Sequence, residues 1–199
     1  LGDGTITKEK GQLSYRGETK QSMHSFATKT LQACLTVRSD LGKIKENNKN
    51  EINYDRRDIG SSELKKLALR WGLEADKKLQ SKIEYASSDF YKGFLRGWAD
   101  ADSSPQGNQK KGVSIRYASI HQDNLFIAQR MLARLGIFSR VYLNRKSAGN
   151  RLLPDGKGGS KEYHCEANHE LMISCNNMKI YNEKIGFEDA KKAFTINAK

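Results

Sequence analysis

The chain has 199 residues, and its 35 Lys and Arg against 23 Asp and Glu give a formal net charge of +12. A hydrophobic content of 37% with two prolines excludes a low-complexity or disordered chain, and no apolar run approaches the roughly 20 residues that a membrane span requires. The excess positive charge makes nucleic acid the first partner to consider, because a protein that neutralises phosphates releases their counterions.

The first part of the chain carries the weaker secondary-structure signals. We expect strands over residues 21–27 and 43–55, with a helix over residues 30–41 between them. Stronger signals begin at Ser87, where Ser87 to Asp89 offer a helix N-cap and the apolar residues that follow predict a helix over residues 90–101.

An amphipathic helix is expected over Asn124–Leu135, and Gly136 stops it. Short segments rich in β-branched or aromatic residues predict three further strands, over residues 113–119, 139–144 and 162–167. The order is helix, strands, helix, strands, helix in each half. This order favours an α+β fold over a doubly wound one.

The chain contains a degenerate internal duplication. Residues 59–80 align without a gap on residues 173–194, at a constant offset of 114. The identical pairs are Ile59/Ile173, Lys65/Lys179, Gly72/Gly186, Glu74/Glu188, Lys77/Lys191 and Lys78/Lys192. We therefore expect two related halves, residues 1–86 and 87–199, in which the second carries about 20 extra residues near the Gly-rich stretch 146–161.

The predicted helix at residue 90 places Gly93, Gly97 and Ala101 on one face, which allows another helix to approach closely. Acidic residues follow at Asp100 and Asp102. If the pseudo-twofold axis runs along this face, Asp3 lies beside Asp102, and two neighbouring carboxylates require a cation or protons. Mg²⁺ prefers oxygen ligands, so a paired-carboxylate metal site is one interpretation. The alternative is that both acids are ordinary solvated residues at a helix end.

These residues resemble a known family. The segment Leu95-Arg-Gly-Trp-Ala-Asp-Ala-Asp102, followed by Ser103, is similar to the LAGLIDADG motif, from which Arg96, Trp98 and Ser103 depart. Residues Leu1 to Gly4 are similar to the last four residues of a second copy, whose helix would be truncated at Leu1. The whole chain resembles the single-chain LAGLIDADG homing endonucleases. The segment 186–192 is similar to the endonuclease domains of inteins.

The resemblance implies two αββαββα halves with saddle-shaped antiparallel sheets in one monomer with an internal pseudo-twofold axis. It also implies site-specific hydrolysis of both strands of a long double-stranded DNA target. Asp3 and Asp102 would bind the metals, with the carbonyls of Gly2 and Ala101 as further ligands. The metal would be Mg²⁺, with Mn²⁺ or Ca²⁺ as possible substitutes.

The family's catalytic lysines map onto Lys78 and Lys192, with Lys77 and Lys191 as register alternatives. These lysines could instead be solvated cations at helix ends. The predicted DNA-binding side chains are basic residues of the strands, and on each a solvated strand face is the alternative. They are Arg16, Lys20, His24, Lys43, Lys45, Arg56 and Arg57 in the first half, and Arg116, Arg140, Arg145, Lys161 and His164 in the second.

No zinc is expected, because His164, Cys165, His169 and Cys175 lack the usual ligand spacing. Three cysteines at unrelated spacings and no export signal suggest a reducing compartment: the cytoplasm, an organelle or a phage-infected host. Two rival functions stay open. One is a LAGLIDADG-fold DNA-binding or RNA-maturation protein without cleavage, and the other is a basic RNA-associated protein.

Overall fold

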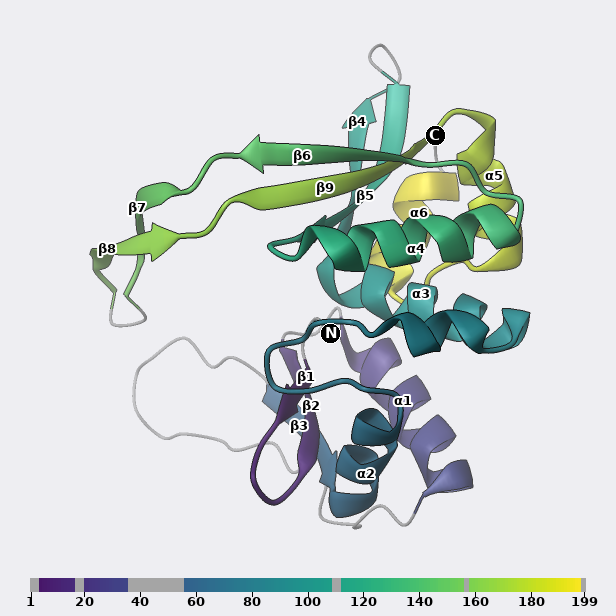
Figure 1. Ribbon diagram of the computed structural model, residues 1–199, viewed down its shortest axis with the longest axis vertical. Helices are drawn as coiled ribbons and strands as arrows, with labels where there is room; N and C mark the ends of the chain where they lie inside the picture. Colours follow the sequence, from purple (N-terminus) through teal and green to yellow (C-terminus); the bar gives the residue numbers. More distant parts are fainter. Residues whose placement is uncertain (1–3, 17–19, 36–55, 109–111, 156–157, 198–199) are drawn as a thin grey trace.

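The computed structural model describes residues 4–16, 20–35, 56–108, 112–155 and 158–197 (Figure 1). The first half contains β1 (Gly4–Ile6), β2 (Gly11–Arg16), α1 (Gln21–Cys34), β3 (Arg56–Ser61), α2 (Ser62–Arg70) and the 3-10 helix η2 (Ser81–Tyr85). The second half contains α3 (Ser88–Asp102), β4 (Ser103–Asn108), β5 (Gly112–Ser119), α4 (Gln122–Arg134), β6 (Arg140–Lys146), β7 (Gly149–Pro154), β8 (Ser160–Cys165), β9 (Asn168–Ser174), α5 (Asn176–Lys184) and α6 (Ala190–Asn197).

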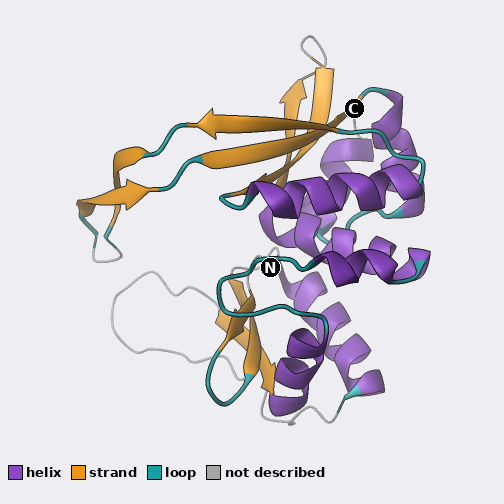
Figure 2. Cartoon of the chain, in the orientation of Figure 1, coloured by secondary structure: helices purple, strands orange, loops and turns teal. Residues whose placement is uncertain are grey.

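The strands form antiparallel sheets, with helices against one face of each main sheet (Figure 2). In the first half the strand order is β1-β2-β3, and in the second it is β4-β5-β9-β6. A separate hairpin of β7 and β8 continues outward from β6 and β9 (Figure 1). It occupies the region where the second half was expected to carry its extra residues. The α+β fold class is confirmed.

Helix α3 has local signals at both ends. The Ser87 hydroxyl accepts a hydrogen bond from the Phe90 amide at 3.2 Å, which caps the first turn. At the other end the Ser103 hydroxyl donates to the Ala99 carbonyl at 2.6 Å. Between these caps, Leu95 and Trp98 are buried against the sheet and the neighbouring helices. The apolar spacing that predicts the helix therefore also fixes which face is inside.

The core lies between the four-stranded sheet and helices α3, α4 and α5. On β5 and β9 the alternate residues Ile115, Tyr117, Leu171 and Ile173 are fully buried. The Tyr117 hydroxyl donates to the Leu95 carbonyl at 3.1 Å and lies 2.7 Å from the hydroxyl of Tyr181 on α5. A buried hydroxyl without such partners would be destabilising. The hydrogen bonds of Tyr117 and Tyr181 therefore favour the one packing of the sheet against α3 and α5 in which both hydroxyls have partners.

The duplication is visible in the structure. Helices α2 and α5 begin and end 114 residues apart, and each is followed by a glycine of positive φ, +74° at Gly72 and +68° at Gly186. A left-handed residue ends a helix most readily when it is glycine. The division of the chain at residue 86 stays a prediction.

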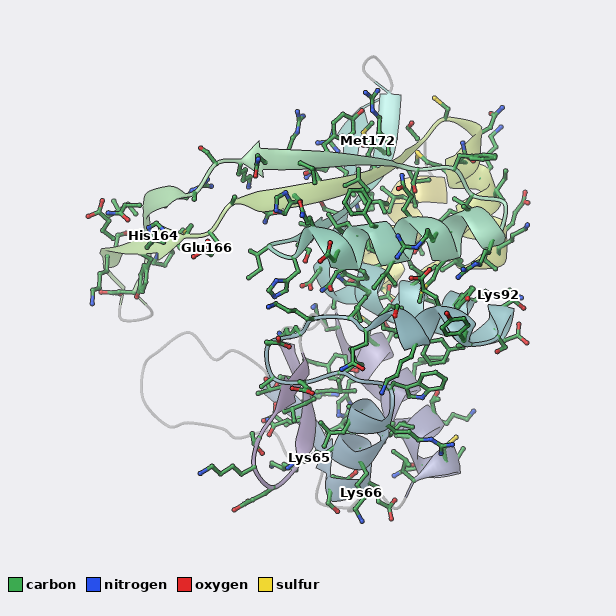
Figure 3. The ribbon with its side chains drawn as sticks, viewed as in Figure 1. Lys65, Lys66, Lys92, His164, Glu166 and Met172 are labelled. Carbon is green, nitrogen blue, oxygen red and sulfur yellow. The ribbon has the colours of Figure 1, made fainter. Side chains whose placement is uncertain are left out.

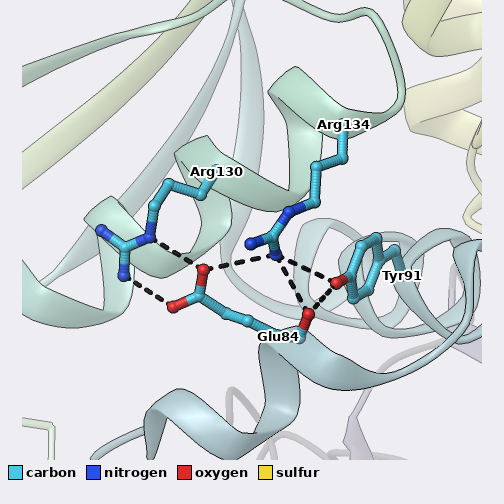
Figure 4. Close-up of polar contacts among 4 residues, drawn as sticks. All are labelled: Glu84, Tyr91, Arg130 and Arg134. Atoms are coloured by element: carbon cyan, nitrogen blue, oxygen red, sulfur yellow. Dashed lines mark hydrogen bonds and ion pairs between the residues drawn. The ribbon is translucent and has the colours of Figure 1, made fainter.

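The segment between the halves is anchored by a cluster of four residues (Figure 4). Glu84 of η2 accepts hydrogen bonds from Arg130 of α4 at 2.7 and 2.8 Å. Arg134 donates to the Glu84 carbonyl at 3.1 Å and to the Tyr91 hydroxyl at 3.0 Å. Tyr91 itself donates to the Glu84 carbonyl. These contacts join the connecting segment to α3 and α4.

Some expected elements are wrong. Residues 21–27 form the start of α1 and not a strand, because Met23, Phe26, Ala27 and Leu31 recur at helical spacing. The helix expected over residues 30–41 is described only to Cys34, and the expected strand over 43–55 lies outside the described residues. Six of the described strands were not predicted: β1, β2 and β3 in the first half, and β4, β7 and β9 in the second. None of the helices in the described ranges is long and apolar enough to span a membrane.

Candidate metal centre and nucleic-acid interface

The end of α3 separates its two acidic residues. Because successive residues turn by about 100° around a helix, Asp100 and Asp102 point to nearly opposite sides. Asp100 is 2% exposed, whereas Asp102 is exposed. The Asp100 carboxylate accepts hydrogen bonds from the amides of Glu188 at 3.2 Å and Asp189 at 3.1 Å. The interpretation of both acids as solvated is therefore wrong for Asp100, which joins α3 to the loop before α6.

Lys192 makes the reciprocal contact from α6 to α3. Its Nζ donates to the carbonyls of Ala99 at 2.9 Å and Asp100 at 2.6 Å. Asp189 accepts hydrogen bonds from the amides of Lys191 at 3.0 Å and Lys192 at 3.1 Å, which caps the start of α6. The lysine amine is thus fixed over the carbonyl end of α3.

Burial sets the electrostatics of this pair of helices. Burial lowers the pKa of Lys192, and the positive charge of Lys20 lowers it further. The carboxylates of Asp189, Asp100 and Asp102 act in the opposite direction. Burial also raises the pKa of Asp100, opposed by the two backbone amides that it accepts from. The interactions of Lys192 with Lys20 and Asp102 show that residues of both halves share this site.

Two more contacts bring the first half to the same place. The hydroxyl of Ser22 on α1 donates to the Glu188 carbonyl at 3.3 Å. Arg96 of α3 forms an ion pair with Glu188 at 3.1 Å, and its guanidinium lies 5.2 Å from the ring centre of Phe26. The start of α1 therefore packs beside the end of α3.

The four-stranded sheet begins where α3 ends, since Ser103 is the first residue of β4. The face of this sheet turned away from the helices is polar and basic. Across the strands, Ser104, Arg116, Met172 and Arg140 lie in register, and so do Ala118, Glu170 and Tyr142 in the neighbouring row. Side chains alternate along a strand, so these residues share the face opposite the buried Ile115, Tyr117 and Leu171.

A cluster of arginines lies on this face around Glu170 and Tyr142. Arg116 contacts the Glu170 carboxylate at 3.3 Å and Arg145 contacts it at 3.6 Å. The guanidiniums of Arg140 and Arg145 lie 5.1 and 5.8 Å from the ring centre of Tyr142. The sequence analysis missed Glu170 and Tyr142, because an acid on β9 and a ring on β6 carry no signal until the two strands are paired.

A known protein family matches the second part of the chain. Residues 89–186 match the family described as the LAGLIDADG-like domain. This part of the chain belongs to that family. The matched residues run from the first turn of the motif helix α3 to Gly186.

Solved structures show the same fold over the whole chain. A mesophilic variant of the homing endonuclease I-DmoI superposes with a TM-score of 0.58 at 14% identity, over 100% of this chain and 92% of that one. A substituted I-DmoI in complex with its target DNA in the presence of Mg gives 0.55 at 13% identity, over 92% and 85%. I-WcaI bound to its DNA recognition sequence gives 0.56 at 12% identity, over 96% and 80%. The chain has the LAGLIDADG homing endonuclease fold.

Curated relatives include the NrdEB subunit alpha of the ribonucleoside-diphosphate reductase of Bacillus subtilis (strain 168). It is 27% identical over 189 residues, which are 89% of this chain and 17% of that protein. The reductase large subunit of Invertebrate iridescent virus 6 is 30% identical over 190 residues, 94% of this chain and 16% of that protein. The chain thus spans about one sixth of these relatives.

Of the residues expected in the LAGLIDADG centre, Lys192 donates to the carbonyls of Ala99 and Asp100 in the last turn of the motif helix, the turn that also carries Ala101 and Asp102. Asp3 and Gly2 lie outside the described residues. Lys78, the counterpart of Lys192, has a side chain 65% exposed with Asp76 at 3.9 Å. Its loop is held by Asn124 of α4, which accepts from the Leu79 amide at 2.8 Å and donates to the Lys77 carbonyl at 2.9 Å.

The potential ligands at this end of α3 are oxygen atoms, the ligand type that hard divalent cations prefer. Asp102 supplies a carboxylate, and its proposed partner Asp3 is outside the described part of the chain. Within the described ranges, no three His, Cys, Asp or Glu side chains are grouped to hold a metal. The histidines considered for zinc make other contacts: His169 Nδ1 accepts from the Asn144 amide at 3.0 Å, and His164 Nδ1 lies 3.2 Å from Asn150 Oδ1.

The remaining predicted DNA-binding residues are dispersed. Lys161 and His164 are exposed on β8 in the projecting hairpin, whereas Met172 lies over the body of the sheet (Figure 3). Lys20 precedes α1 beside Lys192. The placement of His24 on a strand is wrong, since it is 8% exposed on α1 with Tyr15 edge-on at 5.6 Å.

Arg56 and Arg57 are consecutive residues of β3. Arg57 is in register with Tyr15, whose ring contacts α1, so Arg57 belongs to the helix side. Arg56 is paired in register with Arg16 of β2. Lys43 and Lys45 lie outside the described residues. The contacts of these first-half residues with DNA stay a prediction.

Proposed function

We propose that this chain is a site-specific endonuclease that hydrolyses both strands of a double-stranded DNA target with a divalent metal ion. One observation carries the proposal. The amine of Lys192 is fixed on the carbonyls of Ala99 and Asp100 in the last turn of the LAGLIDADG helix. That helix ends at the exposed Asp102, where β4 begins, next to the sheet face that carries Arg116, Arg140 and Arg145. A carboxylate, a fixed cation and a basic face adjoin along one edge.

Each of these groups has a defined role. Lys192 places positive charge on the negative carbonyl end of α3, which would otherwise repel a phosphate. The arginines of the sheet contact phosphates and base edges of the duplex. Asp102, with Asp3 and the carbonyls of Gly2 and Ala101, would hold the metal. When bound, Mg²⁺ lowers the pKa of water and stabilises negative charge on phosphate oxygens, with Mn²⁺ or Ca²⁺ as substitutes.

The decisive experiment removes the Asp102 carboxylate. The target is first found by selection from a randomised duplex library, and cleavage and binding are then measured on the same DNA. Asp102→Asn should abolish cleavage with Mg²⁺ while leaving affinity equal or higher, because one negative charge facing phosphates is gone. The matched control is Asp89→Asn, an exposed acid at the opposite end of α3, which should cut like the parent.

Two outcomes would contradict the proposal. If Asp102→Asn cuts as fast as the parent protein, Asp102 is not a metal ligand. If the parent binds a duplex but cuts it with neither Mg²⁺ nor Mn²⁺, the chain is a DNA-binding protein of this fold without cleavage. A preference for single-stranded RNA, or an affinity that does not fall with salt, would favour an RNA-associated role.

We also infer that the domain is carried within a longer host protein. Its reductase relatives match this chain over only about one sixth of their own length. The sequence flanking residues 1 and 199 in the gene tests this inference: reductase-like sequence on both sides is the expected result.

A further inference from the structure

Glu170 lies at the centre of the sheet face that is turned away from the helices. In register with it are Ala118 on β5 and Tyr142 on β6. The described residues in register around it carry no other carboxylate. Its side chain is 16% exposed, and its Oε2 lies 3.3 Å from Nη1 of Arg116 and 3.6 Å from Nε of Arg145. One acid therefore contacts two of the arginines that face the proposed DNA.

The arginines of this face are fixed by their neighbours. Arg116 also donates from Nε to the Ser114 hydroxyl at 3.0 Å, so its guanidinium is held at two points. Arg145 is held by Glu170 and by the ring of Tyr142, on which Arg140 also lies. A long side chain loses rotamer entropy when it is ordered. Because these contacts hold the guanidiniums without DNA, we expect binding to cost less rotamer entropy.

A carboxylate in this position has two opposite effects on DNA binding. It repels phosphates, and this repulsion is the same for every duplex sequence. It also orients planar guanidiniums, and an oriented guanidinium forms the bidentate contact with O6 and N7 of guanine at a smaller entropic cost. The first effect lowers the affinity for all duplexes, and the second raises only the affinity for the right one.

We propose that Glu170 is a specificity-determining residue: it positions Arg116 and Arg145 for guanine contacts in the major groove and weakens binding to every other duplex. The inference rests on the proposed function, because it requires a duplex DNA target. It assigns guanines of the half-site under β5, β6 and β9 to these two arginines.

The test compares Glu170→Gln with the parent protein and with Glu183→Gln. Glu183 is an exposed acid of α5 that borders a hollow with Ser88 and Lys184 on the helix side, so this control makes the same charge change away from the sheet face. Each protein selects from a randomised duplex library, and its affinity for the selected target and for random duplex is measured. Arg116→Ala is included to locate the positions that Arg116 contacts.

Glu170→Gln should bind random duplex more tightly, and its ratio of specific to random affinity should fall on the order of tenfold. The base positions at which Glu170→Gln loses preference should be guanines. They should include the positions at which Arg116→Ala loses preference. A merely structural role of Glu170 would not give this overlap. Glu183→Gln should keep the parental ratio and base preferences.

An unchanged ratio in Glu170→Gln, or a loss spread evenly over all positions, would overturn the role of Glu170 while leaving the endonuclease proposal intact. If the parent protein itself selects no duplex sequence, the proposed function fails and this inference fails with it. The two failures are thus distinguished by the parent's own selection.

Discussion

The two halves share a plan of strands and helices, but their described residues differ in how much apolar surface they bury. Helix α2 has no buried residue, whereas its counterpart α5 buries Tyr181 completely. The buried apolar cluster runs from Leu79 to Ile185, while among the described residues before it only Met23 and Ile59 are buried hydrophobics. Repeated secondary structure therefore does not imply repeated packing. We expect the second half to carry most of the stability.

The largest expected effect tests this difference at one equivalent pair. Tyr181 and Leu67 stand 114 residues apart, and Tyr181 is 0% exposed while Leu67 is 39% exposed. Tyr181→Ala should lower the free energy of unfolding by about 3–5 kcal/mol, because it removes a buried ring and the partner of the Tyr117 hydroxyl. Leu67→Ala should lower it by less than about 1 kcal/mol. Urea titration measures both, and equal losses would contradict the comparison.

The second prediction concerns the paired lysines. Lys192→Met removes two charge-assisted hydrogen bonds to the end of α3, so it should lower the free energy of unfolding by about 1–3 kcal/mol and also slow cleavage. Lys78→Met should change stability by no more than about 0.5 kcal/mol, because its ion pair is exposed. Thermal melting and single-turnover cleavage of the selected DNA measure the two effects. If Lys78→Met lowers the free energy of unfolding as much as Lys192→Met does, the two lysines do not differ in their contribution to stability and the prediction is wrong.

A smaller, pH-dependent effect is expected where the halves are joined. The hydrogen bond from Arg130, aided by the nearby charges of Arg130 and Arg134, holds the pKa of Glu84 below its ordinary value despite partial burial. A carboxyl with a lowered folded-state pKa stabilises the protein above its ordinary pKa, and this contribution is lost as pH falls below it. Glu84→Gln should therefore cost about 1 kcal/mol at neutral pH. The difference from the parent should shrink between about pH 5 and pH 3. A difference that grows on acidification would reverse the assigned sign.

The smallest expected effect concerns the small-residue face of α3. Among the described residues, none lies within 4 Å of a Cβ built at Gly93. Gly93→Ala should then raise the free energy of unfolding by about 0.5–1 kcal/mol, because alanine loses less backbone entropy in a helix. A thermal melt measures it. A lowered stability would show that another segment of the chain packs closely on this face.

The roles of the candidate site residues stay predictions. The motif at residues 95–102 indicated Asp102 and the family resemblance indicated Lys192, whose amine bonds the carbonyls of Ala99 and Asp100 in the last turn of the same helix. The same reasoning treated Asp100 and Asp102 alike, because adjacency in sequence does not show which side of the helix is covered. The loop before α6 covers Asp100, and that loop lies 88 residues away in the chain.

The sequence by itself determined the elements that have local signals. The cap at Ser87, the apolar spacing of α3 and α4 and the glycine stop at Gly136 depend on neighbours within one or two turns. The alternation of His169, Leu171 and Ile173 in β9 was a local signal of the same kind that the analysis overlooked.

Tertiary structure alone decided the rest. Strand β4, with the sequence Ser-Ser-Pro-Gln-Gly-Asn, has no strand propensity and is extended because it pairs with β5. The contact of Arg116 with Glu170 spans 54 residues and exists only because β5 and β9 are neighbours in one register. Pairing across strands depends on which segments become adjacent, and no local pattern carries that information.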